Sequence, residues 1–279
     1  MLRSPLPSSQ TRPVIEIYKG ITAHACASGR FVRGVDLVRT DGPLTITVTL
    51  VGGADPALIL RRDGARAGDR LAITGTVGGS APGHALLSGE PTDYDPDQSR
   101  PLLTMHHRPS PRLHAGPALA SVGARCGIDI SDGIAREPGH LAKRISIRWG
   151  GDGAARASNV AIVIDIDAVA FHPDAVAMFG LQRACTCGLT VGEDYELLVA
   201  LPQSPVDRAR DAIASETTLA VIGCAVHAQP GGLVTATSGG MPFTLGADGY
   251  VAFPGGGHGD PTHCRSERRT NRSGLVRFL

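Results

Sequence analysis

The sequence GIDISDGIA at residues 127–135 decides the fold class of this chain. Residues 127–130 predict a strand, Ser131, Asp132 and Gly133 form a turn, and residues 134–143 predict a helix. A strand, a tight turn and a helix in immediate succession are typical of proteins that mix both kinds of element.

Strand and helix signals also alternate outside this stretch, which predicts a mixed α/β or α+β fold. Further strands are expected at residues 31–38, 44–52, 70–77, 160–166, 197–201 and 220–224. Further helices are expected at residues 14–28, 84–88, 113–126 and 206–215. Residues 90–112, with their Pro, Asp and His content, are expected to form an irregular crossing.

The composition argues against several classes of protein. Hydrophobic residues make up 42% and charged residues 19% of the chain, as in a globular protein with a sizeable core. The 27 basic and 26 acidic residues nearly cancel, so charge gives no reason to expect a nucleic-acid or membrane partner. The six cysteines form no CxxC pair and are expected to be free thiols. Without an apolar leader or a membrane-spanning run, a cytoplasmic location is expected.

The first candidate site is the pair Asp129 and Asp132, which flank Ser131 at the strand-to-helix junction. Both carboxylates can point toward one place beyond the end of the strand. Mg²⁺ prefers such oxygen ligands, and Ser131 could donate to a phosphate at the helix N-terminus. The alternative is that Ser131 or Asp132 is only an N-cap, and the spacing alone favours this alternative.

The second candidate site is the run VGEDYE at residues 191–196, which precedes an apolar strand. Its three carboxylates could hold a cationic substrate or a metal, or could form a solvated strand entrance, which composition alone favours.

Arg62 lies beside a glycine turn and could clamp a phosphate, although it could equally be a surface arginine. The glycine loop at residues 75–80 lacks the lysine of an ordinary P-loop.

In this order, these motifs resemble the thiamine-monophosphate kinases, which form a superfamily with aminoimidazole ribonucleotide synthetase and selenophosphate synthetase. IDISDG at residues 128–133 and GEDYEL at residues 192–197 carry most of the resemblance. The stretches at residues 34–52, 60–83 and 107–119 add to it, as does DGY at residues 248–250.

The resemblance implies that ATP donates its γ-phosphoryl group to thiamine monophosphate and that Mg²⁺ assists. It assigns no single side chain as catalytic. The residues that it implies as Mg²⁺ ligands are Asp36, Asp129 and Asp132. Those implied to contact ATP are Asp36, Arg62 and Ser131, and those implied to hold thiamine phosphate are Glu193 and Tyr250.

Departures from the family pattern predict an N-terminally truncated chain. No GDDAA-type motif is present, Val35 replaces the second glycine of a GGD motif, and residues 145–159 look like an insertion. Four regions are expected: a disordered lead (1–13), a remnant of the N-terminal ATP-binding domain (14–53), a C-terminal synthetase-like domain (54–260) and a basic disordered tail (261–279). Any homodimer is expected to be weakened, because the family pairs through its N-terminal domain.

Two other functions remain open. One is a non-catalytic protein that binds the nucleotide or thiamine phosphate. The other is a different member of the superfamily, such as a relative of selenophosphate synthetase, which GEDYEL disfavours.

Overall fold

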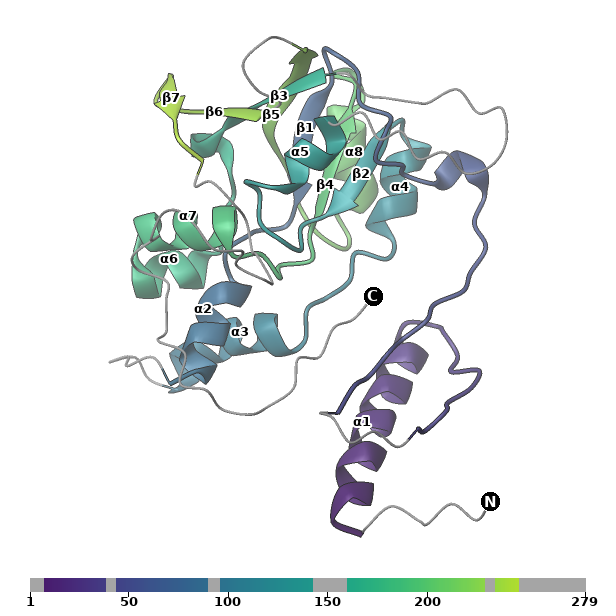
Figure 1. Ribbon diagram of the computed structural model, residues 1–279. Coiled ribbons are helices and arrows are strands. Elements are labelled where there is room, and N and C mark those ends of the chain that lie inside the picture. The colour runs from purple at the N-terminus through teal and green to yellow at the C-terminus, as the bar shows by residue number, and fades with distance from the viewer. Residues whose placement is uncertain (1–7, 39–43, 90–95, 143–159, 229–233, 246–279) are drawn as a thin grey trace. The chain divides into compact units, whose positions relative to one another are not determined.

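The computed structural model describes residues 8–38, 44–89, 96–142, 160–228 and 234–245 (Figure 1). The chain divides into two units, of which the first comprises Met1–Leu50 with Thr270–Leu279 and the second comprises Val51–Arg269. No helix in these described ranges is long and apolar enough to cross a membrane.

The first unit contains the helix α1 (Ser8–Ala27), which confirms the helix expected at residues 14–28 and begins earlier. Pro13 lies inside it, where the missing N–H removes one backbone hydrogen bond. The helix ends at Ala27. Beyond it, Gly29 has a left-handed φ of 70°, and the N–H of Arg30 donates to the carbonyl of Ala25. This is a Schellman-type end, for which glycine is the preferred residue.

The strands expected at residues 31–38 and 44–52 are wrong, because the described residues of both ranges lie outside any strand. The alternating pattern of residues 44–52 predicts an apolar side, but a strand also needs a neighbour with which to exchange hydrogen bonds. Phe31, Val38 and Leu50 are 75%, 80% and 80% exposed, so their side chains lack the packing that would hold a sheet together. Whether residues 14–53 are the remnant of a larger domain stays a prediction.

The described residues of the second unit form a seven-stranded sheet, and the mixed α/β fold expected from the sequence is confirmed. In chain order the strands are β1 (Arg70–Thr74), β2 (Cys126–Asp129), β3 (Val160–Asp165), β4 (Leu197–Leu201), β5 (Leu219–His227), β6 (Val234–Ser238) and β7 (Met241–Phe243). Their spatial order is β2-β4-β1-β5-β3-β6-β7, and all pairs are antiparallel except the parallel pair of β3 with β6.

Helices cover both faces of this sheet (Figure 1). The helices α4 (Ala115–Ser121) and α8 (Val206–Ile213) pack on one face, where Ala72 of β1 lies. The helix α5 (Glu137–Ala142) packs on the opposite face, where Leu71 and Ile73 lie. Successive side chains of a strand point to opposite faces, so β1 contributes to both cores and has no solvent-exposed side.

A separate group of helices gathers beside the sheet around Leu102, Ala175, Met178 and Ala184. It consists of α2 (Ser80–Leu87), α3 (Pro96–His107), α6 (Pro173–Phe179) and α7 (Leu181–Thr190). The expectation of an irregular crossing at residues 90–112 is wrong, because α3 occupies the middle of that range. Its helix packs against α2 and buries Leu102 completely, so tertiary contacts outweigh its polar sequence and internal proline.

Candidate functional site

The two acidic motifs, at residues 129–133 and 192–196, lie side by side because they extend the pairing of β2 with β4. The register places Asp129 opposite Leu197. Beyond the strands, the N–H of Tyr195 donates to the carbonyl of Ile130 at 2.9 Å, and the N–H of Glu193 donates to the carbonyl of Ser131 at 2.9 Å. The structure therefore brings Asp129, Ser131 and Asp132 next to Glu193.

Glycine is needed at two positions of this junction. Gly192 has a φ of 78°, and a Cβ there would lie 2.2 Å from the carbonyl oxygen of Ser131. Gly133 has a φ of 94°, and a Cβ there would lie 2.5 Å from the carbonyl oxygen of Leu189. Both the left-handed backbone and the lack of space exclude a larger residue, so these glycines let the two segments approach.

The backbone of the second motif is strained at two residues. Glu193 and Tyr195 have φ values of 64° and 53°, which place them in the left-handed region that non-glycine residues rarely adopt. Each such residue costs on the order of 1–3 kcal/mol and persists only where surrounding contacts fix it. The residues that alternate with them, Asp194 and Glu196, provide those contacts.

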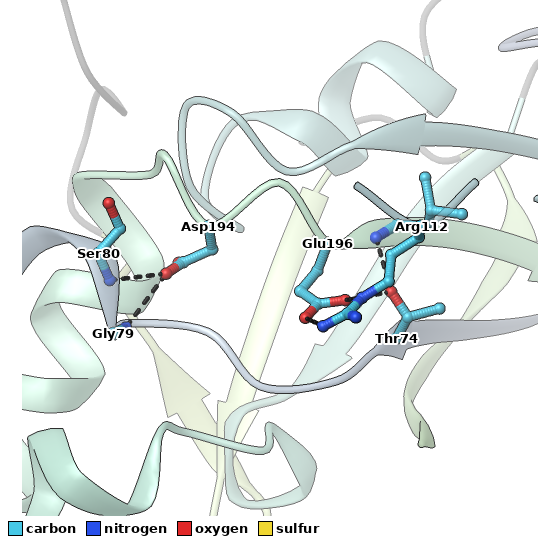
Figure 2. Close-up of polar contacts among 7 residues, drawn as sticks. Thr74, Gly79, Ser80, Arg112, Asp194 and Glu196 are labelled. Carbon is cyan, nitrogen blue, oxygen red and sulfur yellow. Dashed lines mark hydrogen bonds and ion pairs between the residues drawn. The ribbon is translucent and has the colours of Figure 1, made fainter. Parts of the chain in front are cut away.

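Asp194 binds the glycine loop of the same chain (Figure 2). Its buried carboxylate accepts the backbone N–H groups of Gly78 at 2.8 Å and of Gly79 and Ser80 at 3.1 Å each. Burial raises the pKa of Asp194 to about 6, although the three donors favour the charged form. The amide groups that a P-loop would offer to a phosphate are thus used by an internal carboxylate.

Glu196 is the second internal carboxylate (Figure 2). It accepts hydrogen bonds from Thr74 Oγ1 at 2.6 Å and Arg112 Nε at 2.7 Å, and pairs with a second guanidinium nitrogen of Arg112. Only 3% of its side chain is exposed, compared with 52% for Glu193. The acidic run was interpreted either as a ligand site or as a solvated strand entrance. Both interpretations are wrong for Asp194 and Glu196, because these two carboxylates are buried and bind groups of the same chain. Of the three carboxylates, only Glu193 is exposed to solvent, and its role as a substrate ligand stays a prediction.

His106, at the end of α3, is the side chain paired with Glu193. Its Nδ1 lies 3.4 Å from Glu193 Oε2 and 3.0 Å from Ser80 Oγ. Burial lowers the pKa of His106, and the charge of Glu193 opposes that change. Sequence reasoning missed His106 because it lies in the range expected to be irregular, and missed the internal role of Arg112 because its partner is distant in sequence.

The first motif is held by Glu137, a buried residue at the start of α5. The N–H of Asp132 donates to Glu137 Oε1 at 2.7 Å, and the side chain of Asp132 pairs with Arg136 at 3.1 Å. Because α5 begins at Glu137, neither Ser131 nor Asp132 is its N-cap. The alternative that the spacing favoured is therefore wrong.

Three carboxylates, those of Asp129, Asp132 and Glu137, lie close together at this turn. Glu137 is 2% exposed, and burial together with the nearby charges of Asp132 and Asp129 raises its pKa to about 7. Its Oε2 is buried and makes no hydrogen bond. Three carboxylates around one turn repel each other, and a bound cation would relieve the repulsion.

Asp129 and Asp132 are suitable ligands for Mg²⁺, but the two side chains alone do not form a complete coordination site. Within the ranges that the structure describes, no group of three or more His, Cys, Asp or Glu side chains is arranged to hold a metal ion. Mg²⁺ is usually bound by one or two carboxylates together with substrate phosphates and water. The half-buried oxygens of this pair suit such a shared site.

The structure does not bring the other residues implied by the resemblance into this junction. Arg62 is exposed. Its neighbour Arg61 forms a backbone bridge with Cys126, at the start of β2, whereas Asp129 lies at the other end of that strand. Asp36 is exposed in the first unit. Tyr250 lies outside the described residues, as do residues 145–159 and the whole expected tail at residues 261–279.

Comparison with known proteins confirms the family resemblance, although no family model matches the chain. The thiamine-monophosphate kinase of Escherichia coli is 35% identical over 164 residues, which cover 59% of this chain and 46% of that protein. The crystal structure of thiamine-monophosphate kinase from Stenotrophomonas maltophilia is 28% identical, with a TM-score of 0.53 over 65% of this chain and 53% of that chain. A structure of AaThiL complexed with AMPPCP and TMP is 25% identical, with a TM-score of 0.52 over 70% of this chain and 54% of that chain. The chain spans about half the length of the relatives that it matches.

Proposed function

We propose that this chain, a homologue of the thiamine-monophosphate kinases, contributes its second unit to a site that phosphorylates thiamine monophosphate with ATP. The observation that carries the proposal is the hydrogen-bonded junction of residues 129–133 with residues 192–196. It places a pair of candidate metal ligands next to a candidate substrate ligand. Those two motifs also carry most of the resemblance to the kinases.

The reaction needs few proton transfers. A phosphate oxygen of thiamine monophosphate attacks the γ-phosphorus of ATP, the bond from that phosphorus to the bridging oxygen breaks, and ADP leaves. A phosphate monoester with a second pKa of about 6 is largely dianionic at neutral pH, so its oxygen needs no general base. Catalysis then depends on positioning and on neutralising charge.

On the nucleotide side, Asp129 and Asp132 would hold Mg²⁺ together with phosphate oxygens. When bound, the ion would neutralise the charge that accumulates on those oxygens. Ser131 would donate to ATP, and Arg62 would donate to its phosphates. The role implied for Asp36, as a ligand of nucleotide and metal, stays a prediction.

On the acceptor side, Glu193 would attract the cationic thiazolium ring of thiamine monophosphate, because its carboxylate is half exposed. Tyr250 would contact the same substrate. A homodimer and a cytoplasmic location stay predictions of the same proposal.

The first experiment measures nucleotide binding to the whole chain by calorimetry with AMPPCP, with and without Mg²⁺. Asp129→Asn combined with Asp132→Asn should remove the Mg²⁺-dependent part of the affinity while the circular dichroism spectrum is retained. Asp207→Asn with Asp211→Asn, two exposed acids on α8, is the matched control and should change nothing. Unchanged affinity in the first double variant would refute the assignment.

A second experiment separates an enzyme from a non-catalytic binding protein. Purified chain is incubated with ATP, Mg²⁺ and thiamine monophosphate, and thiamine diphosphate is quantified by chromatography. Product that forms with the chain and is lost in the Asp129 and Asp132 double variant supports the kinase. Binding of both ligands without product supports the binding protein.

A further inference from the structure

His106 occupies a position between the helix group and the candidate substrate ligand. Its Nδ1 lies within 3.0 Å of Ser80 Oγ, at the start of α2, and within 3.4 Å of Glu193 Oε2. Ser80 is completely buried, whereas about half of the Glu193 side chain is exposed. The imidazole therefore connects a fixed interior hydroxyl to a carboxylate at the surface of the site.

The position of the ring is set by close packing of α2 against α3. A Cβ at Gly83 would lie 2.1 Å from the carbonyl oxygen of Leu102 and 3.0 Å from the Cβ of His106. Only glycine at this crossing lets α3 approach closely enough for His106 to reach Ser80. The side chain is thus held by its helix as well as by its hydrogen bond.

The charged and titratable groups around His106 decide its protonation. The charge of Glu193 raises the pKa of His106, whereas burial lowers it. His84 and His107, whose ring centroids lie 5.1 Å and 6.0 Å from that of His106, also lower the pKa. Burial is the largest of these influences, so the pKa lies below its ordinary value and His106 is neutral at pH 7. On α6, the other helix packed against α3, His172 faces its own acid, Asp174, at 3.8 Å.

We propose that His106 is a positioning residue for Glu193: in its neutral form, hydrogen-bonded to Ser80, it lies beside the carboxylate and leaves the negative charge available to a cationic substrate. The identity of that cation, the ring of thiamine monophosphate, rests on the proposed function. When His106 gains a proton, it forms an ion pair with Glu193 and competes with the cation. Acidification should therefore weaken substrate binding through His106 as well as through the ligand itself.

The first test measures the coupling of the two residues without any ligand. NMR of the imidazole C–H signals follows the titration of His106 in the wild-type chain and in Glu193→Gln. The variant should lower the pKa of His106 further, because it removes the one nearby charge that favours protonation. Asp174→Asn is the matched control: it should lower the pKa of His172 and leave His106 unchanged. An identical His106 pKa with and without the Glu193 carboxylate overturns the proposal.

The second test measures affinity for thiamine monophosphate by calorimetry between pH 7.5 and pH 5.5, in the wild type and in His106→Gln. Glutamine can keep a polar contact with Ser80 but cannot gain a proton. Because titration of the ligand is common to both proteins, the wild type should lose several-fold more affinity than the variant on acidification. Equal losses overturn the proposal. Absence of binding at every pH would instead refute the assigned substrate of the site, while the NMR titration would still decide whether the two residues are coupled.

Discussion

Replacing Arg112 by methionine should destabilise the second unit strongly, because it leaves a buried carboxylate without its cation. Glu196 is 3% exposed and Arg112 is 18% exposed, and the pair is joined by two hydrogen bonds. A Cβ at Gly75 would lie 2.1 Å from Glu196 Oε1, so the surroundings leave little room for water to replace the guanidinium. After the substitution, the hydroxyl of Thr74 would be the remaining side-chain donor to Glu196.

The expected cost is about 3–5 kcal/mol, the usual consequence of removing one partner from a buried ion pair. For a unit of this size, that corresponds to a fall in Tm of roughly 10 °C. Replacing both partners by apolar residues, Arg112→Met with Glu196→Leu, should cost less than Arg112→Met alone, because no uncompensated charge remains.

The assay is urea unfolding of the whole chain, followed by circular dichroism. Arg100→Met is the matched control, because Arg100 and Asp97 pair at the surface of α3 with side chains 73% and 79% exposed. Such an exposed pair contributes about 0–1 kcal/mol. If Arg112→Met costs no more than Arg100→Met, the buried pair does not stabilise this fold in the way argued above.

Three further predictions concern the junction of the two motifs. Gly133→Ala should lower Tm by more than Gly123→Ala. Both positions have a positive φ, but only a Cβ at position 133 meets a backbone oxygen. Thermal unfolding of the two variants measures the difference. Glu137→Gln, measured in EDTA, should flatten the dependence of stability on pH. The pKa of Glu137 rises from 4.5 to about 7 on folding, so its favourable contribution is complete below pH 4.5 and is lost as the pH rises to 7, about 3 kcal/mol in all. Parallel curves for wild type and variant would exclude this. Asp194→Asn should cost about 1–3 kcal/mol by leaving backbone N–H groups of the glycine loop without an acceptor, and faster hydrogen exchange at the amides of residues 78–80 would report it.

The sequence predicted the elements whose apolar residues are contiguous. Residues 197–201 form the strand expected there, and residues 160–165 form most of another. Alternation at residues 44–52 was misleading, since a pattern of side chains shows which face is apolar but not whether a partner strand exists. The helix α3 was missed because its polar sequence forms a helix only when Leu102 packs against its neighbours.

The candidate site could be predicted only in part. The resemblance implied Asp129 and Asp132 as metal ligands and Glu193 as a substrate ligand, but not that backbone hydrogen bonds would join the two motifs. It could not show which carboxylates of the second motif point inward, because their partners are far away in the chain. Asp194 accepts from Gly78, 116 positions earlier, and Glu196 from Arg112, 84 positions earlier.

The position of β2 at the edge of the sheet has a consequence for how the site forms and opens. The pairing of residue 129 with residue 197 closes a long loop, whose ordering entropy must be offset before the site exists. Within the described residues, β2 pairs with β4 on one side and has only the isolated bridge of Arg61 with Cys126 on the other, so a local fluctuation that frees this edge would separate the candidate metal ligands from Glu193 and leave the rest of the sheet paired. A ligand that contacts both motifs would bind only the closed form and would oppose this opening in proportion to the logarithm of its concentration.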